Sequence, residues 1–213
     1  MKTIFIEQDL DSFSDFHDGE WFKEIFDTLN DTKYIKSFET FITHWWGYSR
    51  AFVLPHLLID SSCAIHPLEL DKEELWRLSL DNNAFKGALW KTAENAYIGL
   101  YYCYENLLIN VVKDITKQPI AVIDRNFNKR LQAVFSDSVA SKLWCNSKVK
   151  SYKEIRNSIV HNAGMATPKL LKLNPKILIK NNEILLSASD TKKLSTNLKT
   201  NVNILKKHLL SQE

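Results

Sequence analysis

Helical apolar spacing runs without a break over about residues 84–117, and this long segment constrains the fold more than any other feature. A helix that is apolar almost all round must be covered on several sides by other elements. Asp81, Asn82 and Asn83 supply N-cap residues before the segment, and Pro119 follows its end. The sequence therefore predicts the central helix of a bundle. Its apolar positions are Leu89, Trp90, Ala93, Tyr97, Leu100, Cys103, Tyr104, Leu107, Leu108 and Val111.

The rest of the chain is predicted to be mainly helical. Only five glycines and five prolines occur among 213 residues, which favours helices over a fold of short strands. Residues 175–187 are the exception, because apolar runs flank Asn181 and Asn182, which tolerate the positive φ angles of a type I′ hairpin turn. The predicted fold class is all-α, a helical bundle with a small β-hairpin near residues 175–187. Further helices are expected at about residues 20–31, 32–54, 71–80, 125–144, 148–162 and 190–210.

Several boundaries between these helices can also be predicted. Residues 1–18 are expected to form a loosely ordered lead-in. Pro55 should stop or kink the second helix, and residues 59–70 are expected to form a loop. Asp124 and Asp190 are the predicted N-caps of the helices that follow them, with a break near residues 136–138 in the first.

Charge is unevenly distributed along the chain. Residues 1–80 hold 15 acidic and 7 basic side chains, whereas residues 146–213 hold 4 acidic and 13 basic ones, within a net charge of only +3. We predict an acidic helical N-terminal extension over residues 1–80, or one layer of the same bundle, and a helical domain over residues 81–213. The basic C-terminal third fits either lysines that favour solubility or an attraction to phosphate groups.

Neither the hydropathy nor the cysteines indicate a membrane or secreted protein. No apolar run approaches the roughly 20 residues of a membrane-spanning helix, and acidic residues follow the N-terminus closely. Cys63, Cys103 and Cys145 are far apart and odd in number, without metal-ligand spacing. We therefore expect a cytoplasmic protein without a membrane partner, a metal or a cofactor.

The segment 148–162 carries the candidate site. On a helix, Tyr152, Ile155 and Ile159 would share one face, whereas Asn157 and His161 would point away from it. Arg156 would lie at the edge of the apolar face, and its long side chain can reach the polar side. Such a polar face is either a functional site or only a solvated surface.

The three polar residues of this segment suit the cleavage of RNA. That reaction needs a base for the 2′-hydroxyl, an acid for the leaving 5′-oxygen and donors for the phosphorane. Imidazole titrates near neutrality and can act as either acid or base. A guanidinium binds phosphate oxygens through two parallel hydrogen bonds. Arg156, Asn157 and His161 are therefore the catalytic candidates.

Arg156-Asn157-Ser-Ile-Val-His161, followed by Asn162 and Gly164, resembles the R-N-x-x-x-H form of the R-x4-6-H motif of the HEPN superfamily. The resemblance implies an all-α, metal-independent endoribonuclease that leaves 2′,3′-cyclic phosphate and 5′-hydroxyl ends. It implies a homodimer whose motif helices face each other, and a role as a toxin or anti-phage defence effector. An antitoxin or regulatory protein would then be a partner. Some paired HEPN toxins carry a modified Tyr two residues after the His, but Ala163 stands there in this chain.

Two further residues could support the site, and the chain also contains a second Arg–His pair. Glu105, on the central helix, is a supporting candidate that could orient Arg156 or His161, as an upstream acid does in some HEPN domains; alternatively it is an exposed polar residue. Asn162 is a second supporting candidate. Arg50 and His56 also have the spacing of the motif, but we predict a structural role because Pro55 should break the helix between them. The alternative function is a catalytically silent HEPN module that binds RNA or a protein partner.

Overall fold

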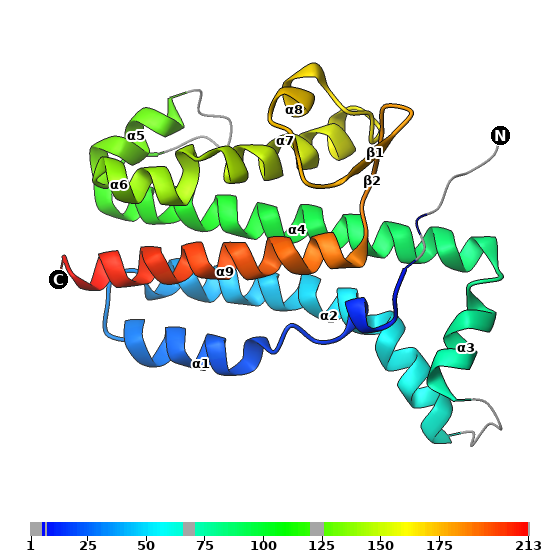
Figure 1. The fold of residues 1–213 in the computed structure, drawn as a ribbon. Helices are drawn as coiled ribbons and strands as arrows, with labels where there is room; N and C mark the ends of the chain where they lie inside the picture. Colours follow the sequence, from blue (N-terminus) through cyan, green and yellow to red (C-terminus); the bar gives the residue numbers. More distant parts are fainter. Residues whose placement is uncertain (1–5, 7, 66–70, 120–125, 213) are drawn as a thin grey trace.

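The computed structural model describes residues 6, 8–65, 71–119 and 126–212. Within them the chain is a bundle of α-helices with one two-stranded antiparallel sheet, which confirms the predicted fold class (Figure 1). The long elements are α2 (Ile35–Ile65), α4 (Asn83–Thr116), α7 (Ser147–His161) and α9 (Ala188–Leu210). The shorter elements are η1 (Asp11–Phe13), α1 (Asp18–Leu29), α3 (Lys72–Ser79), α5 (Phe127–Val134), α6 (Asp137–Ala140), η2 (Ser141–Cys145), α8 (Pro168–Lys172), β1 (Leu178–Lys180) and β2 (Glu183–Leu185).

Helix α4 has the central position that its apolar sequence predicts. It lies between α7 on one side and α2 and α9 on the other (Figure 1). Asn82 caps it by accepting hydrogen bonds from the amides of Ala84 (2.8 Å) and Phe85 (3.3 Å). Its predicted apolar positions are almost all buried, including Leu100, Leu107 and Leu108.

Residues before and after position 80 share one hydrophobic core. Its members come from α1, α2, α4, α7 and α9, and include Phe38, Trp45, Leu108 and Leu198. A buried carboxylate also links three of these helices. Asp18 of α1 accepts a hydrogen bond from the Trp45 indole of α2 (2.9 Å) and pairs with Lys199 of α9. Because both groups of the ion pair are largely shielded from water, losing either one would leave an unpaired buried charge.

The prediction of a loosely ordered lead-in is wrong for the described residues between 8 and 18. Phe13 is fully buried, and its ring packs beside that of Phe52 of α2. Gln8 is buried as well, and its side-chain oxygen accepts a hydrogen bond from the Ala188 amide (2.8 Å). These tertiary contacts order a segment that has little helical periodicity of its own.

Helix α2 is longer than expected, because it continues through Pro55 to Ile65. The predicted loop over residues 59–70 is therefore wrong for positions 59–65. Proline lacks an amide donor and removes one backbone hydrogen bond, which bends a helix without ending it when neighbours hold both halves. The second half of α2 runs at an angle to the first, towards α3 (Figure 1).

Two other predicted helices differ from the structure. The region predicted as one helix over 125–144 is α5, α6 and the π-helix η2, with the expected break at Ser136, which caps α6. The predicted cap Asp124 lies outside the described residues. The N-cap of α9 is Ser187, and Asp190 is its reciprocal partner in a capping box. No helix of the described residues is both long enough and apolar enough to cross a membrane.

The predicted hairpin forms with the predicted turn. Ile179 pairs with Ile184 across the two strands, and Asn181 and Asn182 take positive φ angles of 52° and 65°. Ile184 is fully buried, so the hairpin packs against the bundle.

A close approach of two helices at Gly99 gives a first prediction. A Cβ atom at this position of α4 would lie 2.2–2.4 Å from ring atoms of Tyr48 on α2. We expect Gly99→Ala to destabilise the protein by about 1–2 kcal/mol, because overpacking outweighs the gain in helix propensity. Urea unfolding measures this change.

Gly47 of α2 is the matched control. A Cβ atom there would meet no atom within 4 Å, so Gly47→Ala should raise the free energy of unfolding by up to about 1 kcal/mol. The double variant Gly99→Ala/Tyr48→Ala should recover most of the stability that Gly99→Ala removes. Equal effects of the two glycine substitutions would contradict the close approach.

Burial of Cys103 gives a second prediction. Desolvation raises the pKa of this thiol on α4 to about 12. Only about one thiol in ten thousand would then be ionised at pH 8, and the thiolate is the form that reacts. We expect iodoacetamide to modify the half-buried Cys63 and Cys145 in the folded protein, and Cys103 only after unfolding. Peptide mass spectrometry reads the three sites separately, and equal labelling of Cys103 and Cys145 at pH 8 would contradict the prediction.

Candidate functional site

Helix α7 carries the candidate residues and packs against α4. Asn146 caps it by accepting a hydrogen bond from the Val149 amide (2.9 Å). Of the predicted apolar face, Ile155 is buried and Tyr152 and Ile159 are half-buried. The face is wider than periodicity indicates, because the polar residues Ser151, Glu154 and Ser158 are also buried.

Arg156 and Asn157 are in direct contact. The Arg156 Nη1 group donates a hydrogen bond to Asn157 Oδ1 (2.9 Å), and both side chains are half-buried. The Arg156 Nε atom is buried and has no hydrogen-bond partner among the described residues. Asn157 thus holds one edge of the guanidinium.

His161 lies in the last turn of α7 and is exposed. Its ring has no hydrogen bond or ion pair with any described residue. His161 follows Asn157 by four positions, so both side chains lie on one side of the helix. The structure therefore brings Arg156 and Asn157 together and leaves the imidazole one turn away, facing solvent.

The chain beyond His161 is fixed by backbone contacts to the hairpin. The amides of Asn162 and Gly164 both donate to the Ser158 carbonyl (3.0 Å each), and Gly164 has a positive φ of 81°. The Gly164 carbonyl accepts a hydrogen bond from the Ile184 amide of β2 (2.8 Å). Asn162, a predicted supporting residue, ends the helix with an exposed side chain.

Glu105 contacts a different residue of α7 from those expected. It is buried on α4, so it is not an exposed polar residue. Its carboxylate forms an ion pair with Lys153 (3.5 Å), and no contact joins it to Arg156 or His161 among the described residues. Lys153 also lies over the Trp144 ring, at 4.8 Å from its centroid. Glu105 therefore positions Lys153, which sequence analysis did not single out.

The second Arg–His pair takes part in separate contacts. Arg50 pairs with Asp15, and His56 Nδ1 lies 3.2 Å from Asp60 Oδ2. These contacts are compatible with the predicted structural role, but the reason given for it is wrong, because α2 continues through Pro55. Arg50 and His56 thus each contact a different acidic residue.

Two hollows flank α7, and each is lined partly by lysine side chains. The first, named here the lysine pocket, has a volume of about 440 Å³. It is lined by Tyr101, Asn128, Trp144, Val149, Lys150, Lys153, Glu154, Lys169, Lys172 and Leu173. The second, of about 520 Å³, lies against the opposite face of α7 and includes Tyr97, Ser151, Tyr152 and Ile155.

Two of the motif residues, Asn157 and His161, lie on the same side of α7 as the lysine pocket. Lys150, Lys153, Asn157 and His161 follow one another at spacings of three or four positions, which places neighbouring side chains in one row. The excess of lysines is visible in the sequence, but the pocket is not, because α8 brings Lys169 and Lys172 beside α7 only in the folded chain.

Comparisons with protein-family models, curated protein sequences and solved structures returned no match. The described part of the chain contains no group of three or more His, Cys, Asp and Glu side chains that could hold a metal ion. The functional conclusion therefore depends on the structure of the site. Helix α7 of this α-helical bundle carries an arginine–asparagine pair, an exposed histidine and a neighbouring lysine-lined hollow.

Proposed function

We propose that this protein is a metal-independent endoribonuclease of the HEPN type. The observation that carries the proposal is the contact between Arg156 and Asn157 with His161 exposed one turn further along α7. A buried imidazole surrounded by apolar side chains could not reach a substrate, whereas this ring can. The sequence resemblance supplies the reaction type, and the basic surroundings of α7 favour a phosphate-bearing substrate.

In the proposed reaction, a base removes the proton of the 2′-hydroxyl, and the 2′-oxygen attacks the adjacent phosphorus. The bond from phosphorus to the 5′-oxygen then breaks, and an acid gives this oxygen a proton. The products are a 2′,3′-cyclic phosphate and a 5′-hydroxyl. Arg156 would stabilise the negative charge of the phosphorane, and Asn157 would orient Arg156.

A second copy of the chain would supply the second proton-transfer group. One α7 presents one imidazole, and the reaction needs both a base and an acid. Val160, in the last turn of α7, and Met165, shortly after its end, are exposed apolar side chains. A second copy that covers these residues would bring two His161 rings to one phosphodiester.

The cellular role proposed here follows from the resemblance. A toxin or anti-phage defence effector in the cytoplasm would be restrained by an antitoxin or regulatory protein until it is needed. The acidic residues 1–80 offer a surface of opposite sign to the basic third for such regulation.

The third prediction tests the reaction itself. Purified protein should cleave total RNA equally well with and without EDTA, and the new ends should be cyclic phosphates and 5′-hydroxyls. Enzymatic end-labelling identifies the 5′-hydroxyls directly. Intact RNA under both conditions would contradict the proposed function, and retained RNA binding in that case would favour the silent module.

The same preparation tests the assembly. Light scattering should give the mass of a dimer, and Val160→Asp should convert it to a monomer that does not cleave RNA. Leu58→Asp is a matched control, because Leu58 is also an exposed aliphatic residue in a helix, but on α2. A dimer dissociated by Leu58→Asp but not by Val160→Asp would place the interface elsewhere and contradict the composite site.

A further inference from the structure

The lysine pocket is lined by residues of α4, α5, η2, α7 and α8. Lys150 and Lys153 come from α7, Lys169 and Lys172 from α8, and Tyr101 from α4. Four lysines and one glutamate line the hollow, so its lining carries a net positive charge, which costs free energy in the absence of an anion. A fold that gathers them favours an anionic ligand.

Only part of this positive charge is neutralised within the protein. Lys169 pairs with Glu154 (2.6 Å) and Lys153 with Glu105 (3.5 Å), and both carboxylates are buried. Lys150 and Lys172 form no ion pair with any described residue. The buried carboxylates fix two of the ammonium groups in place, and the other two remain available to a ligand.

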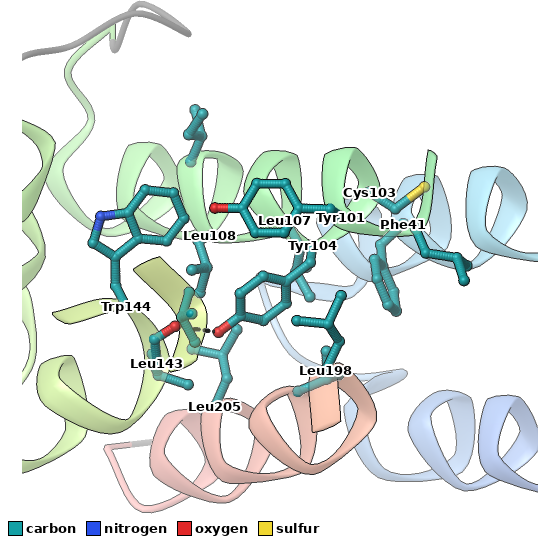
Figure 2. Close-up of a cluster of buried hydrophobic side chains, with 14 of the residues drawn as sticks. Phe41, Tyr101, Cys103, Tyr104, Leu107, Leu108, Leu143, Trp144, Leu198 and Leu205 are labelled. Carbon is teal, nitrogen blue, oxygen red and sulfur yellow. Dashed lines mark hydrogen bonds between the residues drawn. The ribbon is translucent and has the colours of Figure 1, made fainter. Parts of the chain in front are cut away.

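One residue that lines the pocket, Tyr101, has an unsatisfied hydroxyl. The Tyr101 Oη atom is buried and has no hydrogen-bond partner among the described residues, and Figure 2 shows it pointing towards Trp144. The neighbouring Tyr104 differs, because its hydroxyl donates to the Leu143 carbonyl (Figure 2). A buried hydroxyl without a hydrogen-bond partner costs about 1–3 kcal/mol. A hydrogen bond to a ligand oxygen or to an ordered water would offset this cost.

Electrostatics link this pocket to the motif. Burial raises the pKa of Tyr101 well above its usual range, and the nearby positive charge of Arg156 opposes that rise. Arg156 follows Lys153 by three positions on α7, so their side chains are neighbours. An anion in the pocket would therefore lie beside the guanidinium proposed to hold the scissile phosphate.

We propose that the lysine pocket binds a phosphate group of a nucleotide, and that in the full reaction this is the phosphate of an RNA strand that runs along α7 from Lys150 to His161. The second half of this proposal rests on the proposed function. The hollow has the size of a small-molecule site, and ammonium groups bind phosphate as point charges. A free nucleotide and a nucleotide within RNA share this chemistry, so the experiment separates them.

The test compares two pairs of substitutions in the full chain, each with His161→Ala to prevent cleavage. Lys150→Gln/Lys172→Gln removes the two unpaired charges of the pocket. Lys23→Gln/Lys36→Gln removes two exposed lysines, one on α1 and one on α2, and both helices lie on the other side of α4 from α7 (Figure 1). Circular dichroism confirms that both variants fold, and fluorescence anisotropy measures the dissociation constant of a labelled single-stranded RNA across salt concentrations.

We expect the pocket variant to bind RNA at least about 10-fold more weakly than the control variant. The slope of log K against log salt concentration should become shallower by about 0.7 for each phosphate group that the variant no longer neutralises. Calorimetry with a nucleoside monophosphate then shows the source of the phosphate. If the monophosphate binds, and binds more weakly to the pocket variant than to the control variant, the ligand is a free nucleotide. If only RNA binding is weakened in the pocket variant, the ligand is a phosphate group of an RNA strand.

Equal RNA affinities and salt slopes for the two variants, with no pocket-dependent binding of the monophosphate, would overturn this inference even if the unmodified protein cleaves RNA. Conversely, pocket-dependent binding in a protein that never cleaves RNA would support the phosphate site and contradict only the proposed function.

Discussion

His161→Ala should reduce RNA cleavage by about 100- to 10,000-fold, because it removes the proposed proton-transfer group. The ring is exposed and has no partner among the described residues, so its removal should leave the fold intact. Thermal unfolding should therefore be unchanged, and the variant should still bind RNA. The cleavage rate, measured under single-turnover conditions, separates a chemical defect from a binding defect.

His44 supplies the control for this substitution. It is also an exposed histidine within a helix, but it lies on α2, away from α7. His44→Ala should cleave RNA at the rate of the unmodified protein. If His161→Ala retains full activity while the protein is an active ribonuclease, the imidazole of α7 has no part in the reaction.

Arg156→Lys should also abolish most of the activity although it preserves the charge. A reduction of about 100- to 1,000-fold is typical when a donor to the transition-state charge is removed. The guanidinium can use Nη1 for Asn157 and still offer other donors to a phosphate, whereas an ammonium is a single point charge. The structural observation behind this expectation is the hydrogen bond from Arg156 Nη1 to Asn157 Oδ1, which fixes the orientation of the guanidinium.

Arg77→Lys on α3 is the matched control. Arg77 is exposed and its ion pair with Glu74 is long, at 3.8 Å, so its replacement should change neither stability nor cleavage. A single-turnover rate for Arg156→Lys equal to that of the control would exclude phosphate binding through the guanidinium fork. Equal reductions in Asn157→Ala and Arg156→Lys would indicate that the pair acts as one unit.

The residues of α4 explain why so much of the fold could be predicted. A segment that is apolar on almost every side is stable only in the middle of a bundle, and its cap residues give its bounds. The hairpin was predictable for a similar local reason, because two consecutive asparagines fit the backbone of a type I′ turn. Arg156, Asn157 and His161 were recognisable because their spacing is itself a pattern.

Helix α2 and the N-terminal segment show where local signals fail. Pro55 disfavours a helix locally, but packing on both sides of it holds the helix together. Phe13 and Gln8 lack helical periodicity, and they are ordered by contacts with α2 and with the start of α9, far along the chain. Such contacts leave no trace in a window of neighbouring residues.

The sequence by itself determined a helical bundle around α4, the hairpin after residue 175, and a helix that carries arginine, asparagine and histidine at a fixed spacing. Only the tertiary structure decided that Glu105 pairs with Lys153 and that α8 brings Lys169 and Lys172 beside α7. The physical reason is range: helical periodicity and capping act over a few residues, whereas charge pairing and pocket formation depend on segments that meet only when the core is packed.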